Sequence, residues 1–404
     1  MKMKDFVKAG NPATLFAAFL YFDMSFMVWV MLGPLGVHIA KDLGLSPSQK
    51  GMMVAVPVLS GAVLRVFMGL LVDSLGAKKA GLIGQGVVLA ALLCAWIFGI
   101  HSLHQVYLLG VCLGVAGASF AVALPLASRW YPPEAQGLAL GIAGAGNSGT
   151  VFAALFAPML ATHFGWSNVF GLVLIPLTLT MIIYTLMAKD APGLPPPQKF
   201  SRYFQVLKER DAWWFMLFYM VTFGGFVGLA SSLVIYFNSQ FGLTPSTAGY
   251  LTAACVFCGS MFRPIGGTVA DRVGGVRALQ WFYIMVVLTM LGVAVIPTTL
   301  ALTLTFFMMA MMAMGMGNGA VFQLLPQRFQ REIGTLTGLV GMAGGVGGFY
   351  LASSLGLSKQ WTGDYRAGFI MYALLGACAF GILFRVKFRW RATWGAPEVA
   401  RARV

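Results

Sequence analysis

Two arginines, Arg65 and Arg263, stand within long apolar stretches of the sequence, where charged side chains are rare. Arg65 begins the segment RVFMGLLVDSLGAKK and Arg263 begins RPIGGTVADRVGGVR, each eight residues before an aspartate. An arginine at the centre of a bilayer costs about 2.5–3.5 kcal/mol on insertion scales, so two of them need a reason. A guanidinium offers a planar fork of donors that matches the oxygens of an oxyanion. The pair therefore predicts a site for a small, planar or compact, monovalent anion.

A carboxylate partner is the ordinary alternative, because charges buried in apolar surroundings usually pair with each other. Within the predicted membrane helices only Asp23 is acidic, and one carboxylate cannot neutralise two guanidiniums. We therefore expect a bound anion to be the counter-ion. Asp23 itself has two interpretations: it carries a proton that moves with the anion, or it is a fixed member of a polar cluster.

The composition places these residues in a membrane. The 404 residues are 59% hydrophobic and 10% charged, with a mean hydropathy of +0.81, whereas a soluble domain has roughly 25% charged residues. Apolar stretches of about 20 residues recur from Pro12 to Val386, each long enough to cross a hydrocarbon core of about 30 Å. The first of them is too long for a cleaved signal sequence, so we expect it to be a true helix.

Polar and glycine-rich interruptions divide the apolar sequence into twelve predicted helices. Their approximate limits are 13–37, 50–72, 80–100, 104–129, 137–162, 167–187, 212–238, 246–270, 276–297, 299–327, 333–357 and 365–388. Of the 27 Lys and Arg residues, 21 fall on the side of the termini, which predicts that both termini are cytoplasmic. The net charge of +15 is then explained by the orientation of the chain in the membrane, because the basic residues gather on one side. It therefore gives little reason to expect a nucleic-acid partner.

An internal repeat relates the two halves of the chain. A shift of 198 residues superimposes the two arginine segments and aligns Arg65 with Arg263, Gly69 with Gly267, Asp73 with Asp271, Gly76 with Gly274, and Lys79 with Arg277. Two related halves are common in transporters. The predicted fold class is therefore an all-α membrane protein, with twelve transmembrane helices in two pseudo-two-fold related six-helix bundles. The bundles are expected at 1–188 and 212–404, the second with a basic cytoplasmic tail, and a proline-rich cytoplasmic linker at 189–211.

The loops that follow the two arginines resemble a motif of the major facilitator superfamily. Gly69, Asp73 and Gly76 look like the motif between its second and third helices, and Asp271 with Arg272 looks like the second-half copy. The resemblance implies alternating access around a site near the membrane midplane. It also implies that these five residues form a cytoplasmic gate rather than a binding site.

The predicted fifth and eleventh helices are rich in glycine at three- and four-residue spacing, which permits close approach of helix backbones. The residues concerned are Gly141, Gly144, Gly146, Gly149, Gly341, Gly344, Gly345 and Gly347. Any one of them could serve packing alone or lie at the site. Asn147 stands among them, and its amide could donate to a bound oxygen.

Four segments together resemble the nitrate/nitrite porter family: GAGNSG at 144–149, FYMVTFGGFVG at 218–228, RPIGGTVADR from Arg263, and GNGAVFQLLPQRF at 317–329. The resemblance implies that nitrate or nitrite is held between Arg65 and Arg263. It further implies that Phe120, Tyr219 and Phe223 shape the cavity and that Asn147 is a polar contact.

Two modes of transport are consistent with the sequence. Two like charges in an empty site favour an exchanger of nitrate and nitrite, because the unloaded carrier would reorient poorly. Nitrate/proton symport through Asp23 is the other mode, and the short loops favour it, since they resemble the branch that serves nitrate assimilation. We expect a monomeric carrier in the cytoplasmic (inner) membrane, in contact with the lipid bilayer.

Other classes of protein have less support. A receptor for a small anion would need an appended soluble domain, and an enzyme would need a nucleophile, a metal cluster or a cofactor motif. Cys255 and Cys258 form a C-x-x-C inside a predicted helix, without a second pair or a histidine to complete a zinc site. We therefore predict neither a metal, a cofactor nor a catalytic residue.

Overall fold

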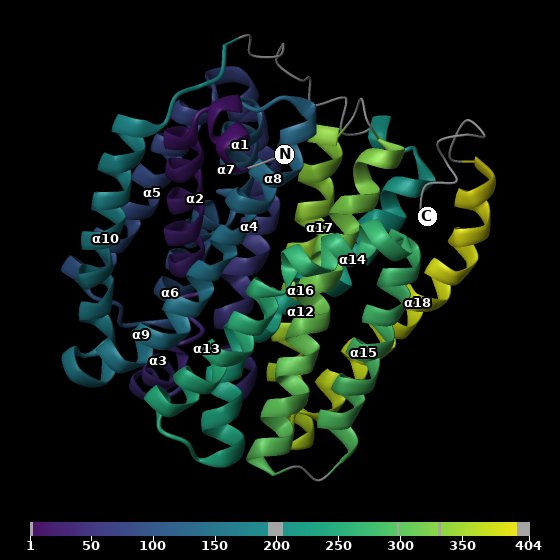
Figure 1. The fold of residues 1–404 in the computed structure, drawn as a ribbon. Coiled ribbons are helices and arrows are strands. Elements are labelled where there is room, and N and C mark those ends of the chain that lie inside the picture. Colours follow the sequence, from purple (N-terminus) through teal and green to yellow (C-terminus); the bar gives the residue numbers. More distant parts are fainter. Residues whose placement is uncertain (1–2, 193–204, 297–298, 330–332, 394–404) are drawn as a thin grey trace.

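The computed structural model describes residues 3–192, 205–296, 299–329 and 333–393, and these are helical with no strand among them. They contain 12 helical segments long and apolar enough to cross a membrane, in agreement with the predicted fold class. Helix α1 (Met3–Ala9) and the last turns of α18 (Arg366–Thr393) lie at the same end of the bundle (Figure 1). We call this the basic end; its cytoplasmic location stays a prediction.

The first half supplies six of the spans. After α1 its helices are α2 (Pro12–Trp29), α3 (Gly36–Asp42), α4 (Pro47–Leu75), α5 (Ala77–Phe98), α6 (Leu103–Gly117), α7 (Phe120–Ser128), α8 (Pro133–Gly144), the 3₁₀ turn η1 (Ala145–Ser148), α9 (Gly149–Phe164) and α10 (Trp166–Met187).

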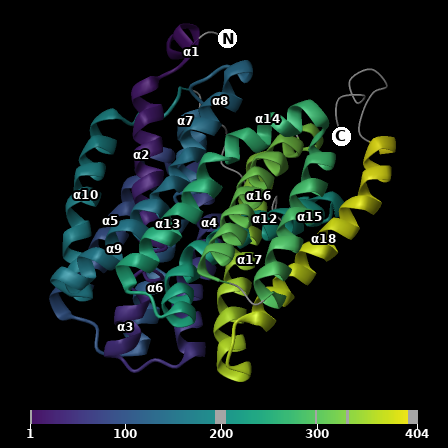
Figure 2. The same ribbon diagram turned by 60° about the horizontal axis from the view of Figure 1, so that its bottom comes forward.

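The second half supplies the other six spans. Its helices are α12 (Arg210–Phe241), α13 (Pro245–Met261), α14 (Arg263–Val273), α15 (Gly275–Val295), α16 (Leu300–Arg328), α17 (Ile333–Thr362) and α18. Helices α10 and α18, the last span of each half, lie at opposite edges of the bundle (Figure 2). The proposed limits of the two bundles and of the linker remain predictions, and much of the linker lies outside the described residues.

Four of the predicted spans are interrupted where the sequence suggested continuous helices. The first ends at Trp29 and is followed by turns before α3, the fourth breaks between α6 and α7, and the fifth contains η1. The eighth breaks at Phe262, where Pro264 in the first turn of α14 lacks the N–H that would continue the hydrogen-bond ladder. Such breaks are tolerated at membrane depth where neighbouring helices surround the freed backbone groups.

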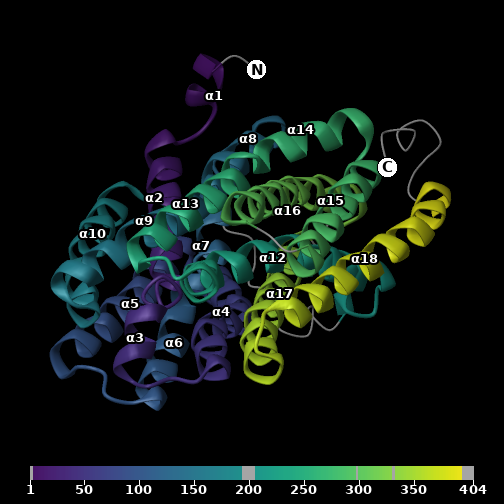
Figure 3. The same cartoon turned by 90° about the horizontal axis from the view of Figure 1, so that it is seen from below.

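The halves make close contact at the end opposite the basic end. Helix α4 packs along α17, and α9 packs along α13, and α4 and α17 lie side by side in the view onto this end (Figure 3). A Cβ on Gly51 would lie 2.7 Å from the Cα of Gly356, so only glycine allows this approach of α4 to α17. Gly249 of α13 abuts the carbonyl of Ala154 in α9 in the same way.

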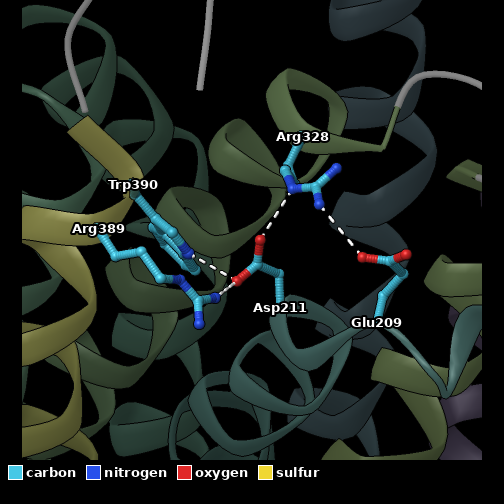
Figure 4. A network of polar contacts seen from close by, with 5 residues as sticks. All are labelled: Glu209, Asp211, Arg328, Arg389 and Trp390. Carbon is cyan, nitrogen blue, oxygen red and sulfur yellow. Dashed lines mark hydrogen bonds and ion pairs between the residues drawn. The ribbon is translucent and has the colours of Figure 1, made fainter. Parts of the chain in front are cut away.

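A buried carboxylate ties three helices together at the basic end of the second half. Asp211, at the start of α12, accepts hydrogen bonds from Arg328 Nε of α16 at 2.8 Å, from Trp390 Nε1 of α18 at 2.9 Å, and from Arg389 (Figure 4). Arg328 also contacts Glu209 at 3.3 Å. With several charged donors around one carboxylate, the burial of Asp211 is compensated, and the ends of α12, α16 and α18 are held in register.

Candidate functional site

Arg65 is fully buried in the middle of α4 and bonds to main-chain carbonyls of two other helices. Its Nη1 donates to the carbonyl of Gly341 in α17 at 2.6 Å, and its Nη2 donates to the carbonyl of Gly117 at 2.9 Å. Gly117 ends α6, and its carbonyl is available because the N–H of Ala121 donates to Ala118 instead. The break between α6 and α7 therefore creates one of the acceptors for Arg65. The Nε of Arg65 is buried and has no hydrogen-bond partner.

Three aromatic rings surround the Arg65 guanidinium. Its Cζ lies 5.6 Å from the ring centre of Trp29, 5.3 Å from Phe120 and 5.4 Å from Phe223. These distances are within the range of cation–π attraction, which is strongest where water is excluded. The rings come from α2, α7 and α12, so three helices besides the hydrogen-bonded ones fix the position of this charge.

Arg263 has a different environment at the first residue of α14, directly after the break at Phe262. Its side chain is partly exposed, one ring lies near its guanidinium (Phe322, 5.8 Å), and its Nη1 is buried without a hydrogen-bond partner. The two guanidiniums are close enough to repel each other, and Tyr219 is within electrostatic reach of both. The structure thus brings the two sequence-predicted arginines together.

The aromatic side chains between the arginines form one connected cluster. Tyr219 and Phe223 stack in parallel with ring centres 4.9 Å apart, and Phe322 packs edge-on against Tyr219 at 5.1 Å and near Phe120 at 6.0 Å. A Cβ on Gly344 would lie within 2.8 Å of both the Tyr219 and the Phe223 rings. Gly344 of α17 therefore makes room for the stacked pair.

Asn147 lies in η1, which packs against α2 of the first half and α13 of the second half. The residue is fully buried, and neither the nitrogen nor the oxygen of its amide has a hydrogen-bond partner. Three residues earlier, a Cβ on Gly144 would be 4.0 Å from the Cζ of Arg263. An unpaired buried donor costs about 1–3 kcal/mol, and a ligand oxygen that accepts from the amide N–H of Asn147 would recover that cost.

Asp23 is buried in α2 beside the same turn. Its Oδ1 accepts a hydrogen bond from Ser148 Oγ at 2.7 Å, and Gly149 presses against its backbone carbonyl. Within the described residues Asp23 makes no ion pair with either arginine. It therefore does not neutralise the pair, and its hydrogen-bond partner directly follows Asn147 in the chain.

The glycines of the predicted fifth and eleventh helices, Gly141 apart, divide into two groups. Gly341, Gly344 and Gly144 border the arginines or their aromatic neighbours, whereas others bring helices together: Gly146 and Gly149 against α2, Gly345 against Ala62 of α4, and Gly347 against Met220 of α12. A Cβ on Gly141 would meet no atom within 4 Å. The spacing of the glycines alone could not have separated these groups.

The residues predicted to form a gate lie nearer the basic end, apart from the arginines. Asp73 forms an ion pair with Arg129 at 3.3 Å, at the end of α7. Gly76 adopts φ 86°, a conformation that favours glycine, and its counterpart Gly274 adopts φ 95°. Gly69 lies in α4, and Asp271 and Arg272 are exposed in the last turn of α14. Their role as a gate stays a prediction.

Three residues near the arginines were not singled out from the sequence. Trp29 and Phe322 contact the guanidiniums, and Asn318 lies one helical turn before Phe322 in α16. Asn318 is fully buried with both amide atoms unpartnered, as Asn147 is. Its position in GNGAVFQ, next to an aromatic residue at i+4, was the available signal.

A twelve-span bundle with one buried and one partly exposed arginine near each other, one from each half, is the architecture of a membrane carrier. The family model of the Major Facilitator Superfamily matches residues 14–352. The fold is also similar to that of a bacterial homolog of the human lysosomal transporter Spinster in an inward-facing, occupied conformation, with a TM-score of 0.72, 16% identity, and coverage of 95% of this chain and 98% of that one. The chain is thus a multi-pass transporter of the cell membrane and not an enzyme.

Comparison with similar sequences assigns the chain to one family within this superfamily. The nitrite extrusion protein of Bacillus subtilis is 31% identical over 366 residues, covering 91% of this chain and 92% of that protein. The probable nitrate/nitrite antiporter NarK1 of Thermus thermophilus is 30% identical, covering 91% and 89%, and the probable nitrate transporter NarT of Staphylococcus epidermidis is 30% identical, covering 91% and 94%. The chain belongs to the nitrate/nitrite porter family of this superfamily, as its sequence motifs predicted.

Proposed function

We propose that this protein carries nitrate, nitrite or both across the cell membrane, with the anion bound between Arg65 and Arg263. The observation that carries the proposal is that each arginine keeps one buried nitrogen without a hydrogen-bond partner, Nε on Arg65 and Nη1 on Arg263. A buried charged donor without an acceptor is costly, and a planar oxyanion supplies several acceptors at once. The unpartnered amide of Asn147 adds a third donor for the anion.

The electrostatics of the site suggest how binding drives the transport cycle. Two guanidiniums from opposite halves repel each other in surroundings of low dielectric, and a monovalent anion between them offsets that repulsion. The loaded carrier can then close around the anion and reorient. The size of the site limits the anion, because Phe120, Phe223 and Tyr219 pack directly around the arginines.

Uptake of labelled nitrate by the purified carrier in liposomes tests the proposal. We expect saturable uptake that nitrite inhibits and sulfate does not, and we expect Arg263→Ala to abolish it. Transport of sulfate or of a sugar at a similar rate would refute the choice of substrate. Normal uptake by Arg263→Ala would refute the site while leaving the family assignment intact.

For the driving force we propose proton symport through Asp23. The carboxylate accepts a hydrogen bond from Ser148, which directly follows Asn147 in η1, so a change in its protonation would alter a contact of the segment that carries the proposed anion ligand. Protonation on binding and release of the proton with the anion would then couple the two movements. Exchange of nitrate for nitrite is the alternative, and the repulsion between the arginines favours it.

Asp23→Asn distinguishes the two modes, because asparagine can still accept a hydrogen bond from Ser148 but cannot titrate. Under symport, an inward pH gradient accelerates uptake by the wild type and not by Asp23→Asn. Asp42→Asn is the matched control: this carboxylate of α3, at the far end from the termini, accepts a hydrogen bond from Trp166 Nε1 that asparagine can also accept. Uptake that depends on internal nitrite and ignores the pH gradient in the wild type would establish exchange instead.

A further inference from the structure

A separate pocket that contains two lysines lies between the two halves at the end opposite the basic end. Its volume is about 50 Å³, and it is lined by residues of α4, α12 and α17, including Lys50, Gly51, Ser232, Tyr236, Gly356 and Lys359. A cavity of that size holds a few water molecules or one small ion. Lys50 precedes Arg65 by 15 residues on the same helix, which corresponds to about 22 Å along the axis. The pocket is therefore separate from the arginine pair.

Positive charge converges on this pocket from both halves. Lys50 belongs to α4 and Lys359 belongs to α17, and no acidic residue lines the pocket in the described part of the chain. This end of the protein is otherwise poor in basic residues: besides these two lysines, the predicted loops on this side contain only Lys41 and Arg366. Half of the lysine and arginine residues of these loops thus meet in one cavity.

The two ammonium groups retain donors that no protein group uses. The ammonium of Lys50 makes no hydrogen bond or ion pair within the described residues. Lys359 donates to the carbonyl of Gly363 at 2.7 Å and lies 5.3 Å from the ring centre of Tyr365, which fixes its position and leaves two of its three N–H groups for other acceptors.

A buried hydroxyl provides independent evidence for a ligand. Ser232 of α12 lines the pocket, is 7% exposed, and its Oγ has no hydrogen-bond partner. A buried hydroxyl is normally satisfied by protein, water or ligand. Because it shares the pocket with two cationic side chains, an anion is the group that would satisfy all three donors together.

We propose that this pocket binds one small monovalent oxyanion of the class carried at the central site, so that the anion is held beside the closed contact between α4 and α17. For the identity of the anion the inference rests on the proposed function; for the existence of the site it rests on the lysines and Ser232. The pocket raises the local concentration of the anion at this end of the transport pathway. It also links a lysine of each half, so that a bound anion offsets their repulsion and favours the arrangement in which Gly51 touches Gly356.

Nitrate binding to the purified full-length carrier tests the site. In neutral detergent with gluconate as the background anion, we expect the wild type to bind two nitrate ions per chain, and Lys50→Gln/Lys359→Gln to bind one. Arg263→Gln should also bind one, and combination of all three changes should bind none. The Arg263-dependent binding that remains in the lysine variant shows that this variant is folded.

The outcomes separate this inference from the proposed function. If the lysine variant still binds two nitrate ions, or if the wild type binds only one that Arg263→Gln abolishes, the pocket is not an anion site and the central site stands. If nitrate binding depends on the lysines and is unaffected by Arg263→Gln, the pocket stands and the central site fails.

Uptake kinetics test the role of the pocket and the source of its ligand. At low ionic strength in neutral phosphatidylcholine liposomes, we expect Lys50→Gln/Lys359→Gln to raise the half-saturating nitrate concentration roughly three- to tenfold, and about 0.5 M gluconate should remove the difference. Lys41→Gln, which alters an exposed lysine outside the pocket, is the matched control. An effect of the lysine variant that appears only in liposomes with phosphatidylglycerol would assign the pocket to a lipid headgroup and overturn the inference.

Discussion

The guanidinium of Arg65 donates to carbonyls of α6 and α17 and contacts three aromatic rings. Arg263 is a partly exposed residue at the start of a helix, and its guanidinium lies near the ring of Phe322. The two residues occupy equivalent positions in the repeat. Their helices differ, however, because α4 is continuous through Arg65, whereas Pro264 accompanies a break directly before Arg263. The two arginines are therefore equivalent in the sequence repeat but differ in their structural surroundings.

This difference indicates that the two arginines have different roles in binding the anion. Arg65 connects α4 to α17 across the two halves and is fixed by contacts that use two of its donor groups. Arg263 is held by fewer contacts and can follow a ligand. We expect the first arginine to determine where the anion binds and the second to close on it, and each prediction below tests one part of that contrast.

The largest effect is expected for Arg65→Ala. This change leaves the carbonyls of Gly341 and Gly117 buried without their donor, at about 1–3 kcal/mol each, so we expect the free energy of unfolding to fall by about 2–6 kcal/mol and uptake to be lost. Thermal unfolding in detergent and nitrate uptake in liposomes measure the two effects. Arg263→Ala should abolish uptake with little loss of stability. An equal loss of stability in both variants would contradict the different roles assigned to Arg65 and Arg263.

Arg263→Lys tests whether the less closely held arginine acts through its fork of donors or through its charge. Lysine keeps the charge but cannot bind two coplanar oxygens from one rigid group. We expect apparent affinity for nitrate to fall about 10- to 100-fold, equivalent to the loss of one charged hydrogen bond of about 1.5–3 kcal/mol. The concentration dependence of uptake measures this. Unchanged affinity would show that Arg263 provides only an electrostatic attraction.

The sequence was sufficient to predict the membrane-spanning helices, which follow from hydropathy, and the two arginines, which stand out as charges within apolar segments. Twelve spans follow from apolar length, and Arg65 and Arg263 stand out because arginine is expensive in a bilayer. The repeat then placed the two arginines at one depth. These inferences use properties of single residues and their spacing, which folding does not alter.

The asymmetry between the arginines could not be predicted in the same way. The acceptor at Gly117 arises from a break between α6 and α7, and the acceptor at Gly341 requires α17 to pass within 2.6 Å of an α4 side chain. Trp29 and Phe322 carry no signal in a sequence with 32 phenylalanines and 10 tryptophans. Which aromatic residue lies against a charge depends on helix rotation, which spacing alone leaves open.

Gly341→Ala tests the fixed position of Arg65 without removing its charge. A Cβ there would lie 3.0 Å from both Cδ and Nη1 of Arg65, so the guanidinium must shift to accommodate it. We expect the half-saturating nitrate concentration to rise about tenfold, the effect of weakening one hydrogen bond by about 1.4 kcal/mol. Gly141→Ala is the matched control, because a Cβ on Gly141 meets no atom within 4 Å. Equal effects of the two changes would show that Arg65 tolerates displacement.

The smallest effect is expected for Phe322→Leu, which removes the ring 5.8 Å from the Arg263 guanidinium and keeps an apolar side chain. A cation–π contact at a partly exposed site contributes about 0.5–1 kcal/mol, so apparent affinity should fall about two- to fivefold. Phe67→Leu, two residues after Arg65 on α4 but 57% exposed, should leave the uptake curve unchanged. Phe223→Leu removes one of three rings around Arg65, and the other two together with the carbonyl bonds should hold that guanidinium in place. A larger loss of affinity in Phe223→Leu than in Phe322→Leu would reverse the comparison, because it would mean that the closely held arginine depends more on each aromatic neighbour than the loosely held one.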